Sequence, residues 1–317
     1  MAHVPVMMKE VLEYLDPKPN QNFVDCTLGD GGHTAAILER TAPDGKVLGI
    51  DADPEAIASV LHNPSQPPGS ALARPVFDPL TLRGGDDRLI AVNDNFRNLA
   101  GIVKEKEFGP ISGILLDLGF SSSTLDRGRG FTFMKDEALD MRFDPSEGIR
   151  ASDIVNGWNQ RQLAELLEEY AEEKFAREIA NLIVERRKQQ SIITTKQLSD
   201  VIVDAYREKL HSKKEMPWLG GIHPATKTFQ ALRIEVNDEL GALQSVLPQA
   251  VEALAPGGRF AVIAFHSLED RIVKQFFRDY ADEKIRLITK KPLVPTDEEI
   301  ENNPRARSAK MRVIEKL

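Results

Sequence analysis

Apolar and polar residues alternate along the first third of the chain in a pattern that predicts strands and helices in turn. Residues 22–28 predict a short buried strand, and residues 33–40 predict a helix that follows a glycine-rich turn. A second strand is expected over 46–50 and a helix over 54–61, because Asp53 suits the N-cap and proline the first helical position. This succession indicates a βαβ unit with parallel strands.

The alternation continues with interruptions. Two further strands are expected over 88–92 and 113–118. Before the first of them, residues 62–85 contain five prolines and predict a long loop or a small insertion, which is usually functional or mobile. Residues 120–150 are rich in Gly, Ser, Asp and Arg and predict another loop.

The middle of the chain has a helical pattern from Ser152, a candidate cap, to about residue 210. Within 163–187, apolar residues recur every three or four positions and form one stripe. Thr194 or Thr195 could cap the next helix. The stripe favours the packed core of a small helical subdomain over a partner-binding face.

The last third returns to the mixed pattern. Residues 226–253 predict one long helix, 259–265 an apolar strand, and 267–280 a helix with Ser267 as N-cap and Asp270 completing a capping box. We therefore expect an α/β fold with a doubly wound, Rossmann-like sheet and an inserted all-helical domain. The expected division is a first part over 1–130, a helical substrate-recognition insertion over 131–225, and a second part over 226–317 with a basic C-terminal tail.

The first candidate site lies at the glycine-rich turn after the first strand. Glycines such as Gly31 and Gly32 let the backbone approach a ligand and expose N–H groups at a helix start. Asp51 follows about 20 residues later at the end of the second strand, where a carboxylate can accept hydrogen bonds from ribose. The turn reads G-x-G-G and lacks the dinucleotide fingerprint, which favours an adenosyl group over a pyrophosphate. A turn that serves packing alone is the other reading.

Asp117 and His266 form a second candidate centre, because both are expected at the carboxyl ends of predicted strands. Ligands of open parallel sheets bind at the carboxyl ends of the strands. A loop aspartate that caps a turn and a structural histidine are the alternative readings. Ser267 is not the nucleophile of a serine hydrolase, because the glycines of G-x-S-x-G are missing on both sides.

Composition narrows the function classes. The net charge is −8, which argues against a protein that grips nucleic acid through bulk positive charge. Residues 302–317 nevertheless hold five basic side chains against one acidic one, so that Arg305 and Arg307 are candidate phosphate contacts. The single cysteine excludes an intramolecular disulfide or a cysteine-type zinc cluster, and no metal site is expected. No apolar run reaches membrane-spanning length, so we expect no membrane partner and a cytoplasmic protein.

Several strings of residues resemble one known family, the ribosomal small-subunit methyltransferase H or MraW family. The matching strings are Asp25 to His33 (DCTLGDGGH), Leu115 to Gly119 (LLDLG), Arg129 to Phe133 (RGFTF), Leu139 to Asp144 (LDMRFD), His223 to Arg233 (HPATKTFQALR), Phe265 to Arg271 (FHSLEDR) and Asn303 to Lys310 (NPRARSAK).

The resemblance implies a class I methyltransferase fold with S-adenosylmethionine as cofactor. It implies methylation of the exocyclic N4 of one cytidine in the decoding region of 16S rRNA, within the small ribosomal subunit; a homodimer is left open. Thr124 stands where the family usually has glutamine or histidine. By position the cofactor contacts are Gly31, Gly32, His33, Asp51, Phe96, Asp117 and Thr124.

The catalytic candidates are Asp117, which we expect to orient the cofactor, and His266, which we expect to help form the base pocket. The remaining candidates are substrate contacts at Asp140, Arg142, Ser267, Arg305 and Arg307. Two other classes are weighed against this reading. A nicotinamide-dependent dehydrogenase is disfavoured by the missing fingerprint, and a non-catalytic adenosyl-binding scaffold would bind the cofactor without transferring a methyl group.

Overall fold

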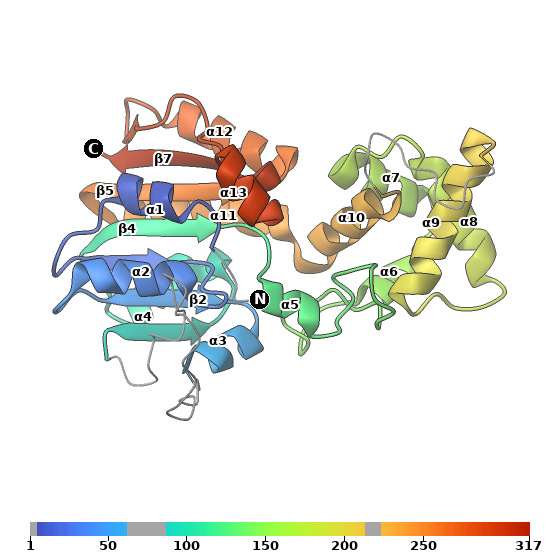
Figure 1. Cartoon of the computed structure of the whole chain (residues 1–317), viewed down its shortest axis with the longest axis horizontal. Helices are drawn as coiled ribbons and strands as arrows, with labels where there is room; N and C mark the ends of the chain where they lie inside the picture. Colours follow the sequence, from blue (N-terminus) through green and yellow to red (C-terminus); the bar gives the residue numbers. More distant parts are fainter. Residues whose placement is uncertain (1–4, 62–86, 213–222) are drawn as a thin grey trace. The chain divides into compact units, whose positions relative to one another are not determined.

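The computed structural model describes residues 5–61, 87–212 and 223–317, and the predicted loop over 62–85 lies outside this range. Contacts divide the chain into two compact units (Figure 1). The first comprises Met1–Ser121 with Leu240–Leu317, and the second is Ser122–Glu239. The boundaries expected from the sequence, after residues 130 and 225, both fall inside the second unit.

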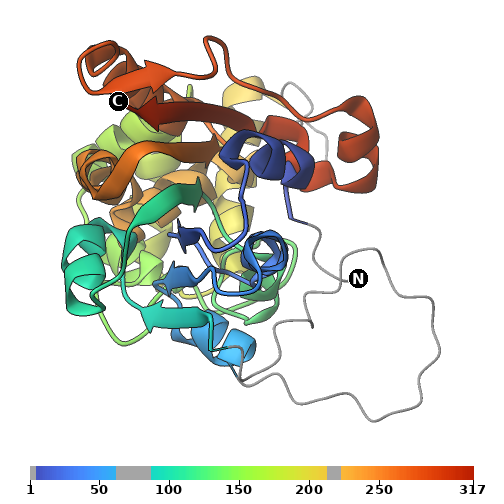
Figure 2. The ribbon, with the colours of Figure 1, turned by 90° about the vertical axis from the view of Figure 1, so that its left-hand side faces the viewer.

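The first unit is built on a seven-stranded sheet in the order β3-β2-β1-β4-β5-β7-β6. Neighbouring strands from β3 to β5 are parallel, whereas β7 runs antiparallel to both β5 and β6. Figure 2 shows the strands stacked in this order. The strands are β1 Asn22–Asp25, β2 Val47–Asp51, β3 Leu89–Asn93, β4 Ile111–Asp117, β5 Leu254–Ala264, β6 Ile285–Leu287 and β7 Lys310–Lys316.

Helices cover both faces of this sheet, as predicted for a doubly wound fold. One apolar cluster joins the sheet to α1, α2 and α3, and another joins it to α4, α11 and α12. The strands pack tightly: a side chain at Gly113 would lie 2.3 Å from the ring of Phe23. The helices are α1 Met8–Leu15, α2 Gly32–Thr41, α3 Pro54–Leu61, α4 Leu99–Glu105, α11 Glu239–Ala253, α12 Ser267–Asp279 and α13 Asp297–Asn302.

The C-terminal residues are not a tail. Lys310–Lys316 form β7, which adds to the sheet between β5 and β6. Arg312 is buried and donates from Nε to Asp270 at 2.7 Å, and Lys316 Nζ donates to the carbonyls of Glu252 and Leu254. The prediction of a basic tail was therefore wrong, because residues 311–314 are all buried and the apolar ones among them contribute to the apolar clusters on both faces of the sheet.

The second unit is helical and has its own apolar core. The apolar stripe over 163–187 belongs to two helices, because Glu172 adopts a left-handed conformation with φ 46° and ends the first. Thr194 caps α9, while the Thr195 hydroxyl donates to the carbonyl of Lys135. The helices are α5 Ser122–Asp126, α6 Ala151–Gly157, α7 Gln160–Ala171, α8 Ala176–Arg187, α9 Thr195–Leu210 and α10 Ala225–Asn237.

Two other helix predictions need correction. The expected helix over 226–253 is broken at Asp238, whose φ of 45° separates α10 from α11. Ser152 does not cap α6, which begins one residue earlier at Ala151. Among the described residues, no helix combines the length and the apolar character needed to cross a membrane.

Candidate active site

The parallel strands bring the predicted cofactor residues to one edge of the sheet. Asp25, Asp51 and Asp117 are the last residues of β1, β2 and β4, which are neighbours in the sheet or one strand apart. Because parallel strands end at the same edge, these three carboxylates and the glycine turn after β1 share it.

The glycine turn is fixed by the Asp51 carboxylate. The N–H of Gly29 donates to one carboxylate oxygen at 2.7 Å, and the N–H of Asp53 donates to the other at 2.8 Å. Gly31 has a φ of 78° and is the N-cap of α2, which no side chain caps. The turn thus presents the start of a helix at the carboxyl edge, an arrangement that suits a polar ligand.

Asp25 holds the inside of this turn. It is buried and accepts from the Thr34 hydroxyl at 2.7 Å and from the N–H of Thr27 at 3.1 Å. Burial raises the pKa of the Asp25 carboxyl, although these hydrogen bonds act in the opposite direction. The Thr27 hydroxyl also accepts from the N–H of Asp117 at 2.8 Å, so this small network ties the turn to the end of β4.

His33 and Asp117 lie together beside the turn. His33 Nε2 is 3.5 Å from an Asp117 carboxylate oxygen, and the two side chains are 7% and 19% exposed. Both ring nitrogens of His33 and Oδ1 of Asp117 are buried and have no hydrogen-bond partner among the described residues. Buried polar atoms are nearly always satisfied in native proteins, so these atoms point to a ligand that completes them.

Phe96 joins the same edge from the next strand. It opens the short 3-10 helix Phe96–Asn98 after β3, and Asn95 caps that helix by accepting from the N–H of Arg97. The Phe96 ring is partly buried against the core of the first unit. Phe96 thereby follows closely after Asn93, the last residue of β3, which pairs with Asp51 of β2.

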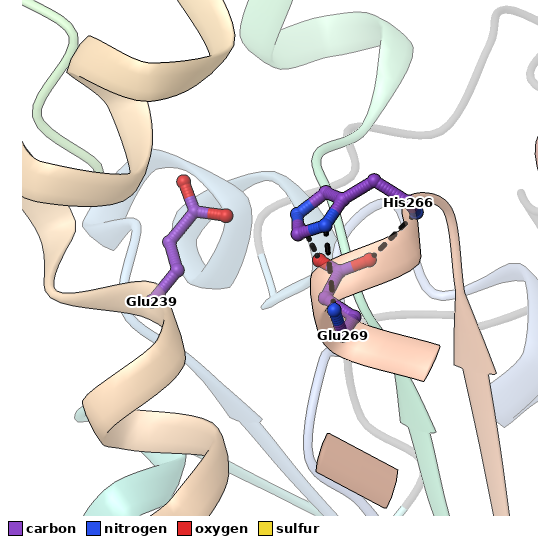
Figure 3. A group of neighbouring side chains, drawn as sticks. All are labelled: Glu239, His266 and Glu269. Atoms are coloured by element: carbon purple, nitrogen blue, oxygen red, sulfur yellow. Dashed lines mark hydrogen bonds and ion pairs between the residues drawn. The ribbon is translucent and has the colours of Figure 1, made fainter. Parts of the chain in front are cut away.

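His266 is the N-cap of α12, a role that we had predicted for Ser267 (Figure 3). Its Nδ1 accepts from the N–H of Glu269 at 3.4 Å, and Glu269 accepts in return from the N–H groups of His266 and Phe265. His266 Nε2 lies 3.1 Å from the other Glu269 oxygen but makes no hydrogen bond among the described residues. The capping box is therefore His266 with Glu269, and Ser267 is an exposed first helical residue.

This cap limits what His266 can do. A ring nitrogen that accepts a hydrogen bond carries no proton, so the neutral imidazole has its proton on Nε2, on the side of Glu269. Taking up a second proton at Nδ1 would remove the cap. The geometry suits a fixed wall of a pocket better than a general base. The sequence analysis did not predict that Glu269 completes this capping box. A glutamate three residues after a polar N-cap residue was the signal that could have shown it.

Arg305 and Arg307 are exposed on the short 3-10 helix Pro304–Ser308. Lys310 follows at the start of β7, directly opposite Ala264 at the end of β5, and its Nζ is 3.7 Å from Asp270. The basic residues at 305–310 therefore lie near the carboxyl edge rather than on a separate tail. Their phosphate contacts stay a prediction.

The remaining candidates belong to the second unit. Arg142 donates from Nε and Nη2 to the two carboxylate oxygens of Asp140, both at 2.8 Å, and from Nη1 to the carbonyl of Glu147. Burial by itself raises the pKa of the Asp140 carboxyl, but the hydrogen bonds from Arg142 outweigh burial and lower this pKa below its ordinary value. Thr124 is buried on α5. That these three contact substrate or cofactor stays a prediction.

The strand order with an antiparallel β7, together with the glycine turn and the carboxylates at the strand ends, defines a class I methyltransferase. Residues 1–317 match the sequence profile of the MraW methylase family, and the chain belongs to that family. Its cofactor is S-adenosylmethionine. The site fits this group, because buried polar atoms of His33 and Asp117 that lack a partner among the described residues lie beside a helix start that no side chain caps.

Named relatives resemble the chain over nearly its whole length. Ribosomal RNA small subunit methyltransferase H from Heliobacterium modesticaldum is 44% identical, covering 99% of this chain and 98% of that protein. The protein of the same name from Thermomicrobium roseum is also 44% identical, covering 100% and 94%. A crystal structure of an rRNA methylase from Streptococcus thermophilus has a TM-score of 0.43 at 11% identity, covering 98% of this chain and 93% of that one.

Proposed function

We propose that this protein transfers a methyl group from S-adenosylmethionine to the exocyclic N4 of a cytidine in 16S rRNA. Membership of the MraW methylase family supports methyl transfer as the reaction, and the name of the relatives supports small-subunit ribosomal RNA as the substrate. The single structural observation that carries it is the His33–Asp117 pair at the carboxyl edge, whose buried ring nitrogens and carboxylate Oδ1 have no partner among the described residues.

When bound, S-adenosylmethionine supplies an electrophilic methyl group on its sulfonium. In-line transfer needs mainly alignment, and a positioned reactant can account for several kcal/mol of the barrier. Asp51, held by two N–H donors, is suited to the ribose hydroxyls, and the Phe96 ring to the flat face of the adenine. Asp117 orients the cofactor next to the reacting groups.

The nucleophile is weak because the N4 lone pair is delocalised into the cytosine ring. A carbonyl or carboxylate that accepts an N4 hydrogen would localise that lone pair. His266, held by Glu269, forms a wall of the base pocket, and the N4 proton leaves to water once methyl transfer is under way. The target base must also leave its stack, which costs a few kcal/mol.

The finer parts of the proposal concern the setting. The substrate is the RNA within the small ribosomal subunit, and the compartment is the cytoplasm; the choice between a monomer and a homodimer is left open. Residues 131–225 recognise the RNA, with Asp140 and Arg142 near the substrate, while Arg305 and Arg307 contact phosphates. Sedimentation of the purified protein tests the dimer.

The test is methylation of purified small-subunit particles that lack the modification, followed by nucleoside mass spectrometry of their rRNA. We expect N4-methylcytidine to appear only with the protein and S-adenosylmethionine. Binding of S-adenosylmethionine without any methylated nucleoside would favour the scaffold, and a thermal shift with a nicotinamide dinucleotide would favour the dehydrogenase. Either result overturns the proposal.

A further inference from the structure

The start of the chain packs on the glycine turn of the cofactor site. A side chain at Gly32, the first residue of α2, would lie 2.3 Å from Cγ of Pro5. Pro5, Val6 and Met7 are all buried, and Met7 has no exposed surface. Residues 5–7, which we call the N-terminal strap, therefore press directly against the backbone that presents Gly31 and His33.

The strap is held in an unfavourable backbone conformation. Met7 has a φ of 54° and a ψ of 36°, which places a residue with a side chain in the left-handed region. That conformation is unfavourable for a residue with a Cβ atom, so surrounding contacts must impose it. No side chain caps α1, which begins at the next residue.

One contact does this from the far end of the chain. The N–H of Met7 donates to Oε1 of Glu299 at 2.6 Å. Glu299 lies on α13, which Thr296 caps by accepting from the N–H of Glu299 itself. Figure 2 shows the dark-blue N-terminal helix beside the red helices near the end of the chain. The acceptor thus sits on a short helix with its own fixed start.

Glu299 is also electrostatically connected to the cofactor turn. Burial raises the pKa of its carboxyl, while the Met7 N–H, Lys9 and His33 lower it and Glu10 raises it. The geometric connection to the turn is the hydrogen bond from Met7 to Glu299 together with the packing of Pro5 on Gly32.

We infer that Glu299 is a positioning residue for the cofactor turn: through Met7 it holds Pro5 against Gly32 and so fixes where Gly31, Gly32 and His33 meet the cofactor. Glu299 itself touches neither cofactor nor substrate in this role. The inference rests on the proposed use of S-adenosylmethionine at this site, and it adds a determinant about 270 residues away in sequence.

The test measures S-adenosylmethionine binding by calorimetry to the full-length protein. Glu299→Ala removes the acceptor, and we expect the dissociation constant to rise about fivefold or more. Glu299→Gln keeps an oxygen acceptor at the same place and should bind within about twofold of the wild type. Glu301→Ala, on an exposed position of the same helix, is the matched control and should change nothing.

A second variant separates positioning from general stability. Pro5→Ala removes the ring atoms that contact Gly32 and should weaken binding like Glu299→Ala. Because both substitutions act through the strap, the double variant should bind S-adenosylmethionine no more weakly than whichever single variant binds it less tightly. Unchanged binding in folded Glu299→Ala, failure of the Gln variant to rescue, or additive effects would each overturn the inference. If the wild type binds the cofactor but methylates no RNA, the proposed function fails while this inference stands.

Discussion

The carboxyl edge of the first unit and the loop around Asp140 in the second unit both contain a carboxylate beside a basic side chain, yet they differ in how these groups are satisfied. His33 and Asp117 approach to 3.5 Å and keep buried atoms without partners. Asp140 and Arg142 are joined by two bonds of 2.8 Å, and Arg142 also reaches a carbonyl. Of the two pairs, only the first has buried polar atoms without any partner among the described residues.

The difference teaches which buried polar groups serve binding and which serve architecture. A buried polar atom without a partner costs about 1–3 kcal/mol, so it persists where a ligand completes it. A fully bonded pair instead stabilises its own loop. The sequence motifs that contain Asp117 and Asp140 are equally conspicuous, and only the contacts in the structure show which of them serves binding and which serves architecture.

The largest effect is expected from breaking the satisfied pair. Arg142→Ala removes both bonds to Asp140 and should lower the free energy of unfolding of the second unit by about 3 kcal/mol. Denaturant unfolding of the purified protein measures it. Arg150→Ala is the control, because Arg150 is 59% exposed and 3.5 Å from the same carboxylate, and it should cost at most about 0.5 kcal/mol. Equal losses in the two variants would mean that the bidentate pair is not what stabilises the loop.

Breaking the unsatisfied pair should affect binding rather than stability. Asp117→Asn is expected to weaken S-adenosylmethionine binding by about 1.5–3 kcal/mol, because hydrogen bonds to a charged group are lost, and to slow methylation with it. Its free energy of unfolding should stay within about 0.5 kcal/mol of the wild type. Calorimetry and denaturant unfolding on one preparation test both. If the variant unfolds more easily yet binds S-adenosylmethionine normally, Asp117 serves architecture, as Asp140 and Arg142 do.

His266 lies between the two cases, because it caps a helix and also faces the carboxyl edge. His266→Ala should cost about 1 kcal/mol of stability through loss of the cap, and leave cofactor affinity within about twofold. Methylation should fall. His266→Asn restores a good cap without the imidazole, so it should recover stability but not methylation. Full recovery of methylation by the Asn variant would mean that His266 only caps α12 and has no role in the base pocket.

The smallest effect is the pH dependence of two carboxylates with opposite shifts. The pKa of Asp25 is raised by burial from 3.8, so its contribution to stability is lost as the pH rises from 3.8 through the raised value. The pKa of Asp140 is lowered, despite its burial, by Arg142, so its contribution is lost as the pH falls from 3.8 through the lowered value. Unfolding of Asp25→Asn and Asp140→Asn across the acid range should each remove one of these trends. Trends of the same sign would contradict the assignment.

Local sequence signals predicted most of the first unit. Residues 54–61 form α3 with the bounds expected from Asp53 and proline, because both signals act within one helical turn. The strand ends that carry Asp51 and Asp117 were also expected, because apolar runs ending in polar residues mark the edge of a buried sheet. The fold and the cofactor class followed from these features and from the family resemblance.

The errors fall where distant contacts override local preference. The helix breaks at Glu172 and Asp238 occur without glycine or proline, at residues with a positive φ that only tertiary packing explains. The cap of α12 was placed one residue late because histidine is an uncommon cap, and here Glu269 holds it. The contact of Met7 with Glu299 joins the two ends of the chain, and no local pattern reports it.

The first unit is assembled from both ends of the polypeptide, which has a consequence for its biosynthesis. As the chain leaves the ribosome, Ser122–Glu239 form a contiguous stretch that can fold as soon as it emerges. The sheet cannot, because β4 pairs with β5 and β5 with β7, and both partners follow the second unit in the sequence. The nascent protein therefore exposes the edge of β4 until β5 has been made, and Met7 finds its acceptor only once Glu299 has been synthesised.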